Sequence, residues 1–101
     1  MLKLTVVQPD YFISETPDKD IEKFIFEKLD GVQEGELILF PEYSNAGGLS
    51  DPERELAALP RAKDMLSVAA KTAKEKSAYV GINFLEERNG DIWNSTYLID
   101  K

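Results

Sequence analysis

The sequence has neither cysteine nor histidine among its 101 residues. Without cysteine, the chain can form no disulfide and has no thiolate metal ligand or thiol nucleophile of its own. Without histidine, it lacks the side chain that most often transfers protons near neutral pH and most often binds transition metals. Acid–base chemistry within these residues must therefore use carboxylates, lysines or tyrosines.

Long apolar segments and an excess of basic residues are also missing. The apolar runs are too short to span a bilayer, and the N-terminus has one basic residue, Lys3, and too short an apolar stretch for a signal peptide. There are 12 Lys and Arg residues against 19 Asp and Glu, which gives a net charge of −7. Phosphate binding needs a basic face, so we expect neither nucleic acid nor a membrane as a partner. We expect a cytoplasmic protein.

The hydrophobic pattern predicts an α/β unit in the order strand, helix, strand, helix, strand, strand. The predicted strands are residues 2–8, 37–40, 79–85 and 92–99, and the predicted helices are residues 17–30, 52–58 and 61–76. We expect the first strand to be mostly buried and the second, an uninterrupted apolar run, to be covered on both faces. Thr16 and Ser50 are typical helix N-caps, and Asn89-Gly90 predicts a tight hairpin turn.

The length of the chain corresponds to one domain or part of one. The sequence stops directly after the last predicted strand, with no closing helix. We therefore expect residues 1–101 to be a single, incomplete domain, the front part of a longer protein. A very small protein that ends in an edge strand is the alternative.

One carboxylate stands directly after the second predicted strand. Pro41 ends that strand because proline has no amide hydrogen and pushes Phe40 toward an extended conformation. Glu42 follows at the carboxyl end of the strand, where α/β sheets open into a ligand crevice. From this pattern alone, a solvated loop acid remains the alternative, because most charges that follow strands are only solvated.

Three short motifs occur along the chain in a specific order and spacing: a strand ending in glutamine (residues 4–8), an apolar-Pro-Glu segment (residues 37–42), and Asn94-Ser95 before an apolar strand. Together they resemble the N-terminal part of the carbon-nitrogen hydrolase, or nitrilase, superfamily. The resemblance covers nearly the whole chain. It implies an α/β layered sandwich, the N-terminal portion of a four-layer αββα fold.

That family hydrolyses nonpeptide carbon-nitrogen bonds in amides, nitriles, ureides or carbamoyl amines with a Glu-Lys-Cys triad and no cofactor. The resemblance implies that Glu42 is the catalytic glutamate, a general base that takes the thiol proton and later activates water. The triad lysine and cysteine belong to segments beyond Lys101, so we expect these 101 residues alone to be inactive. It also implies a small-molecule amide or nitrile substrate and a homo-oligomer formed through the outer helices.

Three further residues are candidates for the same site. Tyr43 and Asn45 flank Glu42 and are candidate substrate-binding residues, with turn formation as the alternative role. Asn94 is a candidate supporting residue that would hydrogen-bond the segment carrying Glu42, with a polar hairpin position as the alternative. Residues 86–88 are interpreted as a solvated hairpin tip, and no metal site is predicted.

Two other functions stay open. The first is a non-catalytic pseudoenzyme or regulatory subunit of the same fold, if the protein contains no triad lysine and cysteine. The second is a small α/β binding or signalling module, for example a receiver-like domain that holds Mg²⁺. Such a domain needs an aspartate at the end of a central strand, whereas Phe40 is followed by Pro41 and Glu42 and Asp10 stands alone after the first strand.

Overall fold

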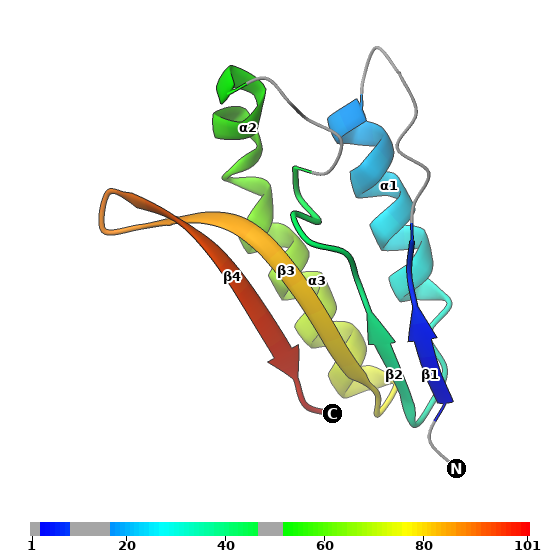
Figure 1. Cartoon of the computed structure of the whole chain (residues 1–101). Coiled ribbons are helices and arrows are strands. Elements are labelled where there is room, and N and C mark those ends of the chain that lie inside the picture. The colour runs from blue at the N-terminus through cyan, green and yellow to red at the C-terminus, as the bar shows by residue number, and fades with distance from the viewer. Residues whose placement is uncertain (1–2, 9–16, 47–51) are drawn as a thin grey trace.

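A computed structural model describes residues 3–8, 17–46 and 52–101 (Figure 1). Its elements are β1 (Lys3–Val6), α1 (Pro17–Asp30), β2 (Glu36–Leu39), α2 (Pro52–Ala58), α3 (Arg61–Glu75), β3 (Tyr79–Arg88) and β4 (Asp91–Ile99). The predicted α/β class and the order of elements are confirmed. The predicted caps Thr16 and Ser50 lie outside the described residues.

The four strands form one sheet in the order β1-β2-β3-β4. β1, β2 and β3 pair in parallel, and β4 returns antiparallel to β3. Asn89 and Gly90 both have positive φ, 54° and 84°, so the predicted hairpin turn is present. Pairing continues up to this turn, which is why β3 extends to Arg88, beyond the predicted end at residue 85.

The hydrophobic core lies between one face of this sheet and the helices. In Figure 1, α1 and α3 lie on the same side of the strands. α1 contributes Ile25 and Leu29, and α3 contributes Met65 with several alanines whose small side chains allow a close approach to the sheet. The sheet residues in this core are Ile38, Phe40, Val80, Ile82 and Phe84. The burial of such apolar side chains supplies most of the free energy that holds the helices against the sheet.

The opposite face of the sheet, which we call the open face, carries no helix of the described chain. Leu4 is 58% exposed and Val6 is 67% exposed, and the side chains of Leu37 and Leu39 are only half-buried. The expectations of a mostly buried first strand and of a second strand covered on both faces are therefore wrong. The residue types suit a two-sided core, but α1 and α3 cover only one side.

A buried carboxylate joins β1 and β2 on the helix-covered face. Glu36 is 4% exposed and accepts hydrogen bonds from the hydroxyl of Thr5 and from the backbone N–H of Gln33, the latter at 2.8 Å. Burial raises the pKa of Glu36, but these hydrogen bonds and the charges of nearby lysines outweigh it and hold the pKa below its ordinary value. None of the helices among the described residues is both long and apolar enough to cross a membrane.

Candidate active site

Glu42 lies in a tight turn that begins where β2 ends. Phe40 N donates to Gly81 O at 2.8 Å, which is the last parallel-sheet contact before Pro41. Ser44 Oγ then donates to Pro41 O at 2.8 Å, and Tyr43 takes a left-handed conformation with φ of 55°. The chain therefore reverses directly after Glu42 and leaves its side chain exposed at the carboxyl end of β2.

Asn94 of β4 holds the Glu42 carboxylate. Its Nδ2 donates a hydrogen bond to Glu42 Oε1 at 2.9 Å. Asn94 lies opposite Leu85 in the antiparallel ladder, so its position follows from the register of β3 and β4. The contact joins the apolar-Pro-Glu segment directly to the Asn-Ser segment. Among the described residues, Asn94 is the one that donates a hydrogen bond to this carboxylate. Oε2 therefore remains available to a ligand.

Asn83 of β3 connects the turn to β4 and determines how the amides are oriented. The backbone N–H of Tyr43 donates to Asn83 Oδ1 at 2.8 Å, and because a backbone N–H can only donate, the Asn83 oxygen must face the turn. Asn83 Nδ2 then faces β4, where it donates to Asn94 Oδ1 at 2.6 Å and to Thr96 Oγ1 at 2.9 Å. Asn94 must consequently present its own Nδ2 to Glu42.

The backbone of Asn83 holds the same turn. Ser44 N donates to Asn83 O at 2.9 Å, in addition to the bond from Tyr43 to the side chain. Asn83 is 8% exposed, and its side-chain oxygen and nitrogen are both paired, as a buried amide requires. The network therefore fixes the turn, both amide groups and the carboxylate relative to one another.

A hollow of about 440 Å³ opens beside this network on the open face of the sheet. Its lining residues are Leu39, Phe40, Glu42, Gly81, Ile82, Asn83, Asn94 and Thr96. Among the described residues of this lining, Glu42 has the one charged side chain, and the other polar groups are amides and a hydroxyl. The hollow can therefore accept a small, uncharged, partly apolar molecule with its polar group against the carboxylate.

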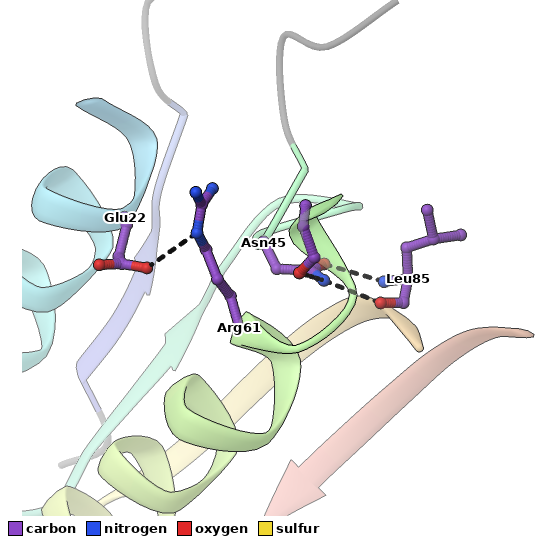
Figure 2. A network of polar contacts seen from close by, with 5 residues as sticks. Glu22, Asn45, Arg61 and Leu85 are labelled. Atoms are coloured by element: carbon purple, nitrogen blue, oxygen red, sulfur yellow. Dashed lines mark hydrogen bonds and ion pairs between the residues drawn. The ribbon is translucent and has the colours of Figure 1, made fainter. Parts of the chain in front are cut away.

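The structure places the other two predicted site residues away from this hollow. Tyr43 is 36% exposed and is not part of the lining. Asn45 is fully buried, and Figure 2 shows its amide facing the backbone of Leu85. It donates to Leu85 O at 2.8 Å and to Ala58 O at 3.1 Å, and it accepts from Leu85 N at 2.9 Å. Asn45 therefore braces the turn against β3 and the end of α2.

Figure 2 also shows the contact between Glu22 of α1 and Arg61 of α3. Arg61 Nε at the start of α3 lies 3.4 Å from Glu22 Oε2 of α1. Both side chains are partly buried, at 24% and 36% exposure. This ion pair lies on the helix side of the sheet, so it supports the scaffold and does not contribute to the hollow.

Sequence reasoning missed Asn83. The residue sits inside an apolar strand, where the pattern around it predicts a core position. The available signal was a polar amide that interrupts the run Val80–Leu85, because a polar side chain in a buried strand needs partners for every hydrogen-bonding group. Those partners come from segments 40 positions and 11 positions away along the chain.

Glu86 differs from the solvated hairpin tip that the sequence predicts for residues 86–88, whereas Glu87 and Arg88 are exposed as expected. The side chain of Glu86 is only 13% exposed, and Tyr97 donates its hydroxyl hydrogen to the Glu86 carboxylate, with both oxygens within 2.9 Å. This hydrogen bond, burial and the charge of Glu86 together raise the pKa of Tyr97 above its ordinary value, and the charge of Arg88 partly opposes them. Across the described segments, no group of three or more metal-ligating side chains is present.

The comparisons with known proteins bear neither on the family nor on the site. No protein-family model matches the chain, and searches of curated proteins and of solved structures give no match.

Proposed function

We propose that this chain supplies the general base of a carbon-nitrogen hydrolase of the nitrilase type, and that Glu42 is that base. The observation that carries the proposal is the 2.9 Å hydrogen bond from Asn94 Nδ2 to Glu42 Oε1. This bond joins the apolar-Pro-Glu segment to the Asn-Ser segment, the two segments whose motifs resemble the family. They are far apart in the sequence. A solvated loop acid has no need of such a partner.

The chemistry assigned to Glu42 is proton transfer. Asn94 occupies Oε1, so Oε2 is the atom that takes the proton from a cysteine thiol supplied outside these residues. The resulting thiolate attacks the substrate carbonyl or nitrile carbon. For an amide, the Glu42 carboxyl then protonates the leaving amine, and it later takes a proton from the water that hydrolyses the thioester. No cofactor enters this sequence of steps.

The lining of the hollow supports a small amide or nitrile as the substrate. Amide and hydroxyl groups of Asn83, Asn94 and Thr96 border the carboxylate, and Leu39 provides apolar surface. The described residues that line the hollow include no lysine or arginine, so they offer nothing to pair with a substrate carboxylate or phosphate. The fold proposed for the complete enzyme is the four-layer αββα sandwich, with the observed sheet and its helices as two of the layers.

The test is turnover by the longest reading frame that contains this chain. We expect hydrolysis of a simple amide, nitrile or carbamoyl amine, and a roughly 10²- to 10⁴-fold loss of kcat in Glu42→Gln. Glu87→Gln is the matched control, because Glu87 is an exposed acid on β3 outside the hollow. Equal activity in the Glu42→Gln variant and the control would refute the assignment. The 101 residues alone should show no turnover.

The second candidate is a subunit of the same fold that binds or regulates without catalysis. A titration of the 101-residue chain with acetamide or propionitrile, followed by NMR of the Asn83 and Asn94 side-chain amides, separates the two. Saturable shifts at these amides, together with a reading frame that supplies no lysine or cysteine, would favour the non-catalytic role. Shifts with Mg²⁺ and none with amides would favour a signalling module.

A further inference from the structure

One backbone group, the N–H of Tyr43, sets the direction of the hydrogen bonds around Glu42. It donates to Asn83 Oδ1 at 2.8 Å, so Asn83 can present only its Nδ2 to β4. Both hydrogens of that nitrogen are then used, one by Asn94 Oδ1 at 2.6 Å and one by Thr96 Oγ1 at 2.9 Å. Asn94 and Thr96 are therefore acceptors toward β3, and their own hydrogens are left for other partners.

Two donors and one acceptor consequently remain at the wall of the hollow. The Thr96 hydroxyl has one hydrogen, and Asn94 Nδ2 has a second hydrogen besides the one that it donates to Glu42 Oε1. Within the part of the chain that the structure describes, neither hydrogen has an acceptor and Glu42 Oε2 has no donor. All three residues line the hollow. A ligand that matches this wall must accept hydrogen bonds at one atom and donate one at a neighbouring atom.

We propose that the hollow binds an amide with at least one N–H, which includes a carbamoyl group, in preference to a nitrile or a carboxylate. The carbonyl oxygen of the ligand accepts from the donors of Thr96 and Asn94, and its N–H donates to Glu42 Oε2. The second contact is the stronger one, because a hydrogen bond to an ionised acceptor is about twice as strong as a neutral one. The inference rests on the proposed function, since it names the substrate class of that site, and it makes Thr96 a specificity-determining residue.

The other chemical classes leave part of this wall unpaired. A nitrile accepts a hydrogen bond but has no N–H, so Glu42 Oε2 loses water without gaining a partner. A carboxylate brings a second negative charge beside Glu42, and the described lining residues include no lysine or arginine to offset it. An ammonium group pairs with Glu42 but cannot accept from Thr96. Of these classes, the amide alone satisfies both the donors and the acceptor.

The same orientation suits the proton transfers proposed for Glu42. The N–H contact places the leaving nitrogen beside Oε2, the atom that returns the thiol proton to that nitrogen when the carbon-nitrogen bond breaks and the carbon-sulfur bond has formed. The acid released after hydrolysis of the thioester carries a carboxylate, which Glu42 repels. The hollow should therefore release this product and bind a new amide.

The first experiment compares four ligands that share an ethyl group: propionamide, N,N-dimethylpropionamide, propionitrile and propionate. Each is titrated into the 101-residue chain at pH 7, and NMR follows the side-chain amides of Asn83 and Asn94. We expect propionamide to bind with a dissociation constant in the millimolar range, as suits so small a ligand, and roughly ten-fold more tightly than the other three. Equal affinities, or no saturable shift with propionamide, would overturn the proposal.

Glu42→Gln should abolish or reverse this preference. Asn94 Nδ2 still needs an acceptor, so the new glutamine presents its oxygen to Asn94 and its Nε2 to the hollow. The wall then consists of donors, and propionitrile and propionate should bind at least as tightly as propionamide. The control Glu87→Gln removes the same charge from β3 outside the hollow and should retain the preference for propionamide. A preference for propionamide that survives Glu42→Gln would refute the proposed contact.

Two substitutions of Thr96 test its hydroxyl. Thr96→Val removes the hydroxyl with little change of shape, whereas Thr96→Ser retains it. We expect the affinity for propionamide to fall several-fold in Thr96→Val and to stay near the parent value in Thr96→Ser, with the amide spectrum of each variant as the check of its fold. Equal affinities in the two variants would overturn the role given to Thr96.

Turnover by the longest reading frame separates this inference from the proposed function. Hydrolysis of propionitrile at least as fast as that of propionamide, with both reactions lost in Glu42→Gln, would support the function and overturn the preference for amides. Selective binding of propionamide without hydrolysis would support the ligand class and refute the function.

Discussion

Asn94 Nδ2 lies 2.9 Å from Glu42 Oε1 although the two residues are 52 positions apart in the chain. Asn94 is carried by the antiparallel strand β4, Glu42 by the turn after the parallel strand β2, and Asn83 of β3 hydrogen-bonds to both segments. The position of the carboxylate therefore depends on the joint geometry of three segments. The first prediction concerns the residue between them.

Asn83→Ala should free the turn that carries Glu42. The substitution leaves the Tyr43 N–H without its acceptor and removes the donor to Asn94 Oδ1, and such losses cost about 2–3 kcal/mol in stability. Asn94→Ala should cost less than about 1 kcal/mol, because that side chain is exposed. Urea unfolding measures both, and hydrogen exchange at Tyr43 N should accelerate only in Asn83→Ala. Equal exchange rates in the two variants would contradict the role given to Asn83.

Glu36 should make the stability depend on pH in the acid range. Its folded-state pKa lies below the ordinary value of 4.5, so between these two values the unfolded chain binds more protons than the folded one. The contribution of Glu36 to the free energy of unfolding is therefore complete above pH 4.5, and it disappears as the pH falls through the lowered pKa. Glu36→Gln should cost about 1–3 kcal/mol at pH 7 and much less near pH 2. Urea unfolding of both proteins at several pH values measures this difference, and a pH-independent difference would be incompatible with it.

Tyr97 should stabilise the folded protein at neutral pH and lose this effect in strong alkali. Its pKa is raised above 10.0 chiefly by the hydrogen bond to Glu86, so the folded protein retains the hydroxyl proton longer than the unfolded chain does. The contribution is present below pH 10 and is lost as the pH rises through the raised pKa. Tyr97→Phe should cost about 1 kcal/mol at pH 7 and remove the last step of the tyrosinate absorbance titration. A titration in Tyr97→Phe that still shows that late step would argue against the assignment.

Gly81 should be intolerant of a side chain because of Leu39. A Cβ atom at Gly81 would lie 2.6 Å from Leu39 Cδ2, so Gly81→Ala must displace the end of that leucine, at a cost of about 1–3 kcal/mol. Leu39→Ala removes the obstructing atom. The double variant should therefore be more stable than the sum of the single effects by about 1 kcal/mol, as a double-mutant cycle of unfolding free energies would measure. Additive effects would indicate that the two residues do not meet.

Much of the fold could be predicted from local patterns. The helix 17–30 has apolar residues at three- and four-residue spacing, and the turn at Asn89-Gly90 follows from the residue types that tolerate positive φ. Burial was less predictable. Val6 has the residue type of a core strand, but whether a strand is covered on its second face depends on the elements that pack there. The helices α1 and α3 both lie on the other side.

The site residues also fall into those that local patterns predicted and those that they did not. A proline and a carboxylate after an apolar strand made Glu42 a candidate, and the family resemblance implied its role as the base. Asn94 was named as the residue to support its segment. Asn83 was missed, since its partners come from the turn after β2 and from β4. Asn45 is next to the same turn in sequence, yet its side chain faces Leu85 and Ala58, because the left-handed residue Tyr43 turns the chain inward.

The sequence by itself determined the element types, the hairpin turn and the placement of one acid after β2, because these depend on residue types close together in the chain. Only the tertiary structure decided which face of the sheet stays open, which amide holds Glu42, and that the Glu42 hollow lies on this open face. These properties follow from the register of strands far apart in sequence, and a register is set by the packing of the whole sheet against its helices.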